Sequence, residues 1–216
     1  MFPLFSVIII LMKTILVPVT CPKCGHEAYV KSEQFIIPAF NQKHRLAILD
    51  GTFFRYICPV CQNHIQCIHP CLYHDHEKHL LIAMQPIQES KEVLVRAEQE
   101  PIQRLVHTPD QMRETIQIFE DGFHDVPMAY LKGRLIQQFE KHGEKISNIF
   151  YHDYDQQSQY LWFDVVSEQE SDLRAIPLAI YQELETHTKA LIDDTQIREV
   201  SISDIMNSLI PLKKDC

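Results

Sequence analysis

Glycine is scarce in this sequence, with five residues in a chain of 216. None of the five belongs to a glycine-rich loop of the kind that holds a nucleotide phosphate. The chain also lacks a recognisable pairing of a nucleophile with a base, and it lacks a converging set of carboxylates. The sequence therefore offers no candidate catalytic residue, and we do not expect an enzyme.

An excess of basic charge is also missing. The formal net charge is −9, and residues 1–100 hold equal numbers of basic and acidic side chains, so residues 101–216 carry the whole excess of acid. Proteins that bind nucleic acid through its phosphates need a basic field. Nucleic acid is therefore not the expected partner, although binding near Lys23 and Lys31 is an alternative, and an unidentified protein partner is the better expectation.

The sequence has no long apolar run that suits a membrane span. Residues 2–11 are apolar but too few, and Lys13 and two prolines interrupt the combined apolar stretch of residues 2–19. No basic residue precedes this run, and no small-residue cleavage site follows it, as a signal peptide requires. We interpret residues 1–14 as a leader or a start-site extension with translation beginning at Met12. A signal or anchor is the alternative, and we expect a cytoplasmic protein without membrane association.

Seven cysteines are present, and this odd number argues against a closed disulfide framework. Four of them form the pairs Cys21–Cys24 and Cys58–Cys61, which read "CPKC" and "CPVC". Two such pairs supply the four thiolates of a tetrahedral Zn²⁺ site. The alternatives are a redox-active dithiol in one pair, or cysteines that are buried without a ligand.

The residues around the two pairs favour the metal site. A proline follows the first cysteine of each pair and stiffens the entry to the turn, and Gly25 can take the positive φ that turns amides toward the sulfurs. In the second pair Gln62 stands in the place of this glycine, and Asn63 is expected to take the left-handed backbone instead. The 33 residues between the pairs add roughly 0.6 kcal/mol of loop-closure cost per doubling. Structural zinc contributes roughly 10–16 kcal/mol, so the long insertion is no obstacle.

The pattern along the chain predicts an α+β fold, with a zinc-ribbon-like β module followed by a helical module with a β-hairpin. The ribbon-like module spans residues 15–87. A charged linker with a short strand follows at 88–107, and residues 108–216 form an acidic α+β module. Strands rich in β-forming residues are expected around both cysteine pairs, at 15–19, 28–30, 52–57 and 64–68, with 34–39 extending the first hairpin and 80–84 following.

Helix signals are clear at several places. Asn41 can cap a helix that runs to Leu49, and Thr108 with Pro109 and Gln111 forms a capping box. A second long helix begins at Asp125 and ends near residue 143. Further along we expect a hairpin at 146–154 and 159–166, a helix at 177–188, a strand at 198–202 and a helix at 204–210.

Histidines follow the second cysteine pair in the segment "YHDHEKH". We interpret it as a solvated turn or edge strand, with His74–Asp75 as a hydrogen-bonded pair or functional site and a metal site with His76 and His79 as alternatives. Cys67, with His64 and His69 nearby, is a possible substitute ligand, but a buried thiol is the favoured interpretation. Cys71 is also expected in the core, and Cys216 is a thiol near the end of the chain.

Three segments together resemble the CpXC family of bacteria and archaea, which is defined by two C-P-x-C motifs and has no established molecular function. "FFRYICPVC" resembles the approach to the second motif. "CLYHDHEKHLLIAMQP" and "RLVHTPDQMRETIQIFEDGFHD" resemble the segments that follow it, so the likeness covers about residues 15–140. It implies a bacterial zinc protein with Cys21, Cys24, Cys58 and Cys61 as ligands. Gln62 departs from the glycine usual in the family.

Overall fold

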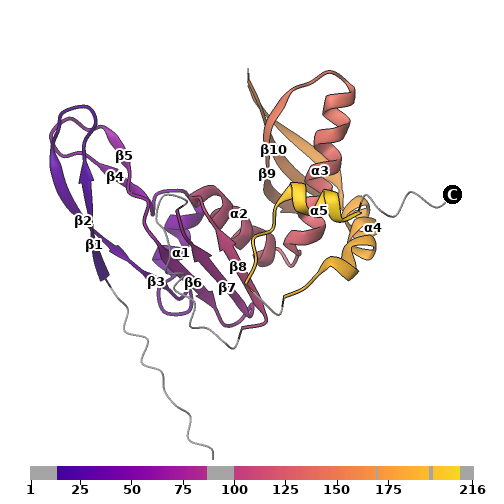
Figure 1. The fold of residues 1–216 in the computed structure, drawn as a ribbon, viewed down its shortest axis with the longest axis horizontal. Helices are drawn as coiled ribbons and strands as arrows, with labels where there is room; N and C mark the ends of the chain where they lie inside the picture. The colour runs from indigo at the N-terminus through magenta and orange to yellow at the C-terminus, as the bar shows by residue number, and fades with distance from the viewer. Residues whose placement is uncertain (1–13, 87–99, 169, 195–196, 210–216) are drawn as a thin grey trace, which may run out of the picture.

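The computed structural model describes residues 14–86, 100–168, 170–194 and 197–209 (Figure 1). The expected leader, residues 1–14, lies outside these residues except for Thr14. The strands are β1 (Thr14–Thr20), β2 (Glu27–Glu33), β3 (Phe35–Ile36), β4 (Arg55–Ile57), β5 (His64–Gln66), β6 (Cys71–Asp75), β7 (Leu80–Met84), β8 (Ile102–Val106), β9 (Ile146–Asp155), β10 (Tyr160–Ser167) and β11 (Ser171–Pro177). The helices are α1 (Gln42–Leu49), α2 (Pro109–Glu120), α3 (Asp125–Lys141), α4 (Leu178–Thr188) and α5 (Ile202–Leu209), with a 3₁₀ turn at Lys189–Leu191. The predicted α+β fold is confirmed. Within the described parts of the chain, no helix is long and apolar enough to cross a membrane.

Two antiparallel hairpins, β1–β2 and β4–β5, project together from one side of the molecule, and we call them the ribbon arm (Figure 1). Side chains alternate between the two faces of each strand. In β1–β2 this alternation leaves Leu16 and Tyr29 exposed, at 60% and 74%, while Val19 is buried. The arm carries one cysteine pair at the tip of each hairpin, as the sequence predicts.

A four-stranded sheet with the order β3-β6-β7-β8 forms the base of the arm. All five residues of β7 are buried, as expected of a central strand covered on both faces. Residues 34–39 do not extend the first hairpin, contrary to the prediction. Phe35 and Ile36 instead pair in parallel with β6, because Ile36 is fully buried in the core of this sheet rather than on the arm.

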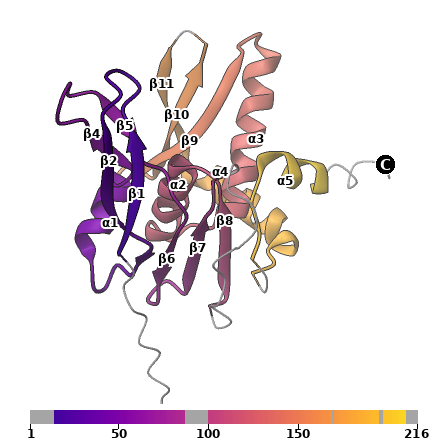
Figure 2. The ribbon, with the colours of Figure 1, turned by 60° about the vertical axis from the view of Figure 1, so that its left-hand side comes forward.

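Helix α2 lies between the four-stranded sheet and the C-terminal sheet (Figure 2). Its capping box is confirmed: Gln111 N donates to Thr108 Oγ1 at 3.2 Å, and the Gln111 side chain accepts from the Thr108 amide at 3.1 Å. Met112 and Ile116 pack into the core of the four-stranded sheet, and Ile118 packs into the core of the C-terminal sheet. One helix therefore contributes to both cores.

The C-terminal part combines the sheet β11-β10-β9 with α3 and α4. The expected hairpin is confirmed as β9–β10, but β11 is not predicted, because its mostly exposed residues show no apolar alternation. The strand expected at 198–202 is reduced to one bridge between Arg104 and Arg198. Ser201 Oγ accepts a hydrogen bond from Asp204 N at 3.1 Å, so this segment already caps α5.

Ion pairs connect the N-terminal sheet to the C-terminal part. Arg104 on β8 is 1% exposed and pairs with Asp125 at the start of α3 and with Asp194, at 2.5 and 2.7 Å. Buried charges of this kind need partners.

The linker expected at 88–107 is described only in part. Residues 87–99 lie outside the described part, whereas 102–106 form β8 and pair with β7. The domain boundaries stay a prediction.

Candidate metal centre

The two cysteine turns have the same backbone geometry. In the first, Gly25 N donates to Cys21 O at 2.9 Å, and Cys21 N donates to His26 O at 2.8 Å. In the second, Gln62 N donates to Cys58 O at 2.9 Å, and Cys58 N donates to Asn63 O at 2.9 Å. Each turn thus closes on the first cysteine of its pair and holds both thiols on one side.

Left-handed backbone occurs at the same place in both turns. Gly25 has φ +73°, and Gln62 has φ +57°. The expectation that Asn63 would take this conformation is wrong. The amide that donates to Cys58 O belongs to Gln62, so this residue must turn, although a side chain there is strained by about 1–2 kcal/mol.

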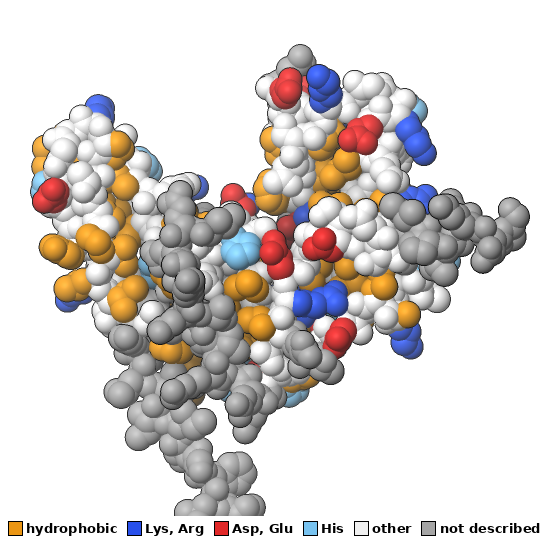
Figure 3. Space-filling model, in the orientation of Figure 1, with side chains coloured by type: hydrophobic (Ala, Val, Ile, Leu, Met, Phe, Trp, Pro, Cys, Tyr) orange, Lys and Arg blue, Asp and Glu red, His pale blue; other side chains and the backbone are white. Residues whose placement is uncertain are grey.

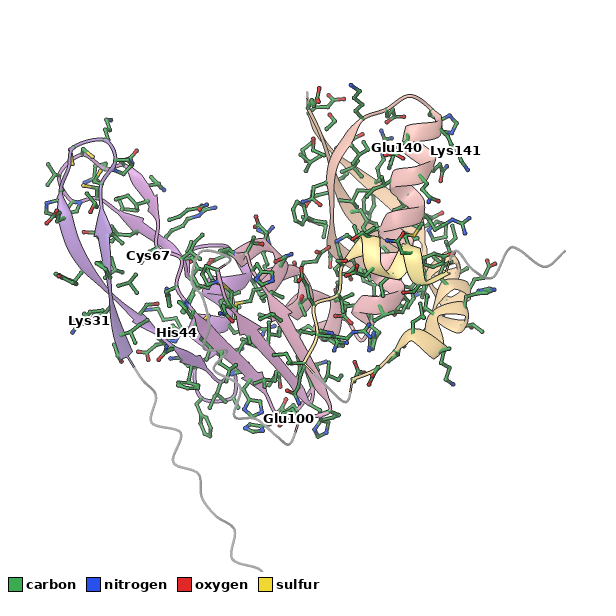
Figure 4. All side chains as sticks on the ribbon, in the orientation of Figure 1. Lys31, His44, Cys67, Glu100, Glu140 and Lys141 are labelled. Atoms are coloured by element: carbon green, nitrogen blue, oxygen red, sulfur yellow. The ribbon has the colours of Figure 1, made fainter. Side chains whose placement is uncertain are left out.

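The four sulfur atoms converge at the tip of the ribbon arm (Figure 4). Cys21 Sγ lies 3.5 Å from Cys61 Sγ, and Cys24 Sγ lies 3.6 Å from Cys58 Sγ. All four lie within 4.8 Å of one another. Sulfurs bound tetrahedrally to zinc at about 2.3 Å are about 3.8 Å apart, so the donor set and the spacing fit one metal ion. The assignment of these four cysteines as zinc ligands stays a prediction.

Backbone amides also point at the sulfurs and set their protonation. Burial opposes ionisation of Cys21, but hydrogen bonds from the amides of Cys24 and Lys23 outweigh it and lower the pKa of this thiol to about 6. The amide of His26 favours the Cys24 thiolate, yet burial and the neighbouring thiols raise the pKa of Cys24 to about 12. A group of four thiols that holds one thiolate near neutral pH favours the binding of a cation. Binding then releases the protons of the other thiols.

The other cysteines and histidines near the second pair do not join this site. Cys67 is buried, as expected, and burial raises its pKa. Cys71 is also buried, in the core of the four-stranded sheet. His69 is buried with Nδ1 3.0 Å from Cys67 O, whereas His64 is exposed on β5. Cys216 lies outside the described residues.

The histidine segment differs from its expected form. The His74 side chain is 12% exposed, and its partner is Glu100 rather than Asp75: His74 Nε2 lies 2.8 Å from Glu100 Oε1. Asp75 Oδ1 instead accepts hydrogen bonds from the amides of Glu77 and Lys78. Sequence reasoning missed Glu100, because 26 residues separate it from His74 and no local pattern joins them.

Two cysteine turns at the tips of two hairpins bring four thiols to one point. This arrangement defines the class of protein as one with a four-cysteine candidate metal centre. The comparison with protein families agrees with this class. The chain matches the CpXC protein family over residues 19–132, slightly more than half of its length, and it belongs to that family. Neither the curated proteins nor the solved structures contain a match.

Proposed function

We propose that this chain is a non-enzymatic zinc-binding protein of the CpXC type, whose four-cysteine site supports a protein-interaction or regulatory role. The convergence of the four sulfurs from two separate hairpins carries the proposal. Four thiolates complete the tetrahedral shell of Zn²⁺ and leave no position for water or substrate. The metal is therefore structural, and it fixes the tips of the two hairpins to each other.

Zinc content tests the structural role. Untagged full-length protein, purified without chelators, is expected to carry zinc at this site, and Cys24→Ser is expected to lose it together with stability. Lys23→Ser is the matched control, because Lys23 lies in the same turn, is exposed and supplies no thiolate. Elemental analysis gives the content. Wild-type protein without zinc, or Cys24→Ser with unchanged zinc, would contradict the proposal.

A thiol oxidoreductase is less well supported by the same geometry. A reactive thiol combines a low pKa with access to solvent. Here the thiol with the lowered pKa, Cys21, is 1% exposed, while exposed Cys24 has a raised pKa. Thiol titration separates the two functions. A chelator is expected to release four thiols from a metal site, whereas a disulfide would keep two masked until a reductant is added.

The ribbon arm favours a protein partner over nucleic acid. Leu16, Tyr29, Ile57 and Val60 are all more than half exposed on the arm, and Figure 3 shows apolar side chains gathered there. The arm has few basic residues, and a zinc ion with four thiolates adds a charge of about −2. Exposed apolar surface of this kind marks interaction sites.

Paired substitutions on the arm test the interaction. Leu16→Ser with Tyr29→Ser is expected to abolish partner recovery from lysate of the source cells, measured by quantitative mass spectrometry. Leu173→Ser is the matched control, because Leu173 is 47% exposed on β11, away from the arm. Equal recovery of every protein by the double variant and the wild type would contradict the interaction role. Binding by the wild type that is lost when the lysate is treated with nuclease would also contradict it.

A further inference from the structure

Four polar side chains meet at one end of the four-stranded sheet, away from the ribbon tip. His74 is on β6, His76 and His79 belong to the turn between β6 and β7, and Glu100 precedes β8. Figure 4 places Glu100 at this end of the sheet. Because β8 runs parallel to β7, its start lies beside the β6–β7 turn.

The distances within this group suit a metal ion. His74 Nε2 and His76 Nδ1 lie 2.8 and 3.0 Å from the same oxygen, Glu100 Oε1. The ligand atoms of these three residues lie within 4.8 Å of one another. Ligands at about 2.1 Å from an ion are about 3.0–3.4 Å apart for octahedral or tetrahedral angles, so small shifts would admit one.

The second carboxylate oxygen of Glu100 gives an independent reason to expect a cation. The Glu100 side chain is 9% exposed, and Oε2 is buried without a hydrogen-bond partner among the described residues. His79 Nδ1 is the nearby basic group, at 3.4 Å from this oxygen. A buried carboxylate oxygen that makes no hydrogen bond is costly, and a bound ion would satisfy it.

We propose that His74, His76 and Glu100 form a second metal site, which takes a divalent transition-metal ion such as Zn²⁺. Two imidazoles with one carboxylate suit such ions, whereas Mg²⁺ and Ca²⁺ prefer sites made of oxygen ligands. His79 is not part of this group of three, although its Nδ1 lies 3.4 Å from Glu100 Oε2. Neutral histidines bind through the nitrogen that now faces Glu100, with the ring proton on the other nitrogen.

The surroundings provide both an entry path and support. A surface cleft of about 660 Å³ is lined by His74 and His76 together with Arg45 and Glu120. The turn that carries His76 is held by the two amides bound to Asp75. An ion can therefore reach the site from solvent, and the backbone beside His76 is already fixed before it binds.

Equilibrium dialysis of untagged, full-length protein against Zn²⁺ tests this site, with elemental analysis as the readout. Two zinc ions per chain are expected. His76→Ala and Glu100→Gln should each weaken the second equivalent at least tenfold, since outer-shell changes alone cost roughly 10–100-fold. His152→Ala is the matched control: His152 is 51% exposed against 55% for His76, and its Nδ1 lies 3.0 Å from one carboxylate oxygen, of Asp164.

The outcomes separate this site from the four-cysteine centre. Cys24→Ser should remove one equivalent and leave the histidine-dependent one, whereas His76→Ala should do the reverse. One equivalent per chain that depends on Cys24 alone would overturn the second site and leave the first intact. Equal weakening by His152→Ala and His76→Ala would also overturn it, because binding would then reflect surface histidines in general.

Discussion

Glu114 and Lys132 form a buried ion pair between α2 and α3, and breaking it should destabilise the protein strongly. Lys132 Nζ lies 2.7 and 2.9 Å from the two carboxylate oxygens of Glu114, and both side chains are about one-tenth exposed. Tyr151 N on β9 donates to Glu114 Oε1 at 2.6 Å. The carboxylate therefore joins three elements.

Glu114→Gln keeps an acceptor for Tyr151 N but leaves the ammonium of Lys132 without its counter-charge. Breaking a buried pair in this way costs about 3–5 kcal/mol. The Phe150 ring, with its centroid 5.9 Å from Lys132 Nζ, offers partial compensation. We therefore expect the lower end, about 3 kcal/mol, which for a chain of this size corresponds to a melting point lower by about 6–12 °C.

Thermal and urea unfolding in zinc-containing buffer measure this loss. The double variant Glu114→Gln with Lys132→Met should recover at least part of it, because no unpaired charge remains. Asp172→Asn is the matched control: its pair with Arg174 is half exposed, and its loss should cost less than about 1 kcal/mol. A loss below about 1 kcal/mol for Glu114→Gln, or a double variant less stable than Glu114→Gln alone, would refute the reasoning.

Two further predictions concern the second cysteine turn and the buried arginine. Gln62→Gly should strengthen zinc retention against a competing chelator by about 1 kcal/mol, since glycine adopts φ +57° without strain; Gln66→Gly on β5 should not. Burial opposes ionisation of Asp194, but Arg104 and His124 lower its pKa below the usual 3.8. Its stabilising effect is therefore present near neutral pH and is lost as the pH falls through the lowered value. The stability difference between wild type and Asp194→Asn, measured by urea unfolding across the acid range, should shrink in that direction; a difference that grows would contradict this sign.

Local chemistry made much of the fold predictable. The turn at Cys21, the capping box at Thr108 and the hairpin β9–β10 follow from short-range patterns, and they are confirmed. Pairings between distant segments were not predictable, because hydrogen bonds of the backbone carry no sequence signature. The transfer of β3 to the sheet of β6 is of this kind. β11 pairs with the strand directly before it and was missed for another reason, because its mostly exposed residues show no apolar alternation.

The candidate sites show the same division. The four cysteines are recognisable by their spacing, and the structure brings them together. Glu100 gives no such signal, because its contact with His74 depends on the parallel pairing of β7 and β8. The left-handed backbone was expected at Asn63, because asparagine has a propensity for it. The hydrogen bond from the Gln62 amide to Cys58 O instead requires this conformation at Gln62.

The position of α2 in two cores has a consequence for how the chain unfolds. Met112 and Ile116 support the four-stranded sheet, while Ile118 and Glu114 support the C-terminal elements. If either half unfolds and takes α2 with it, apolar surface of the other half becomes exposed. Melting should therefore be a single cooperative event, and a cut on either side of α2 would leave one fragment without part of its core.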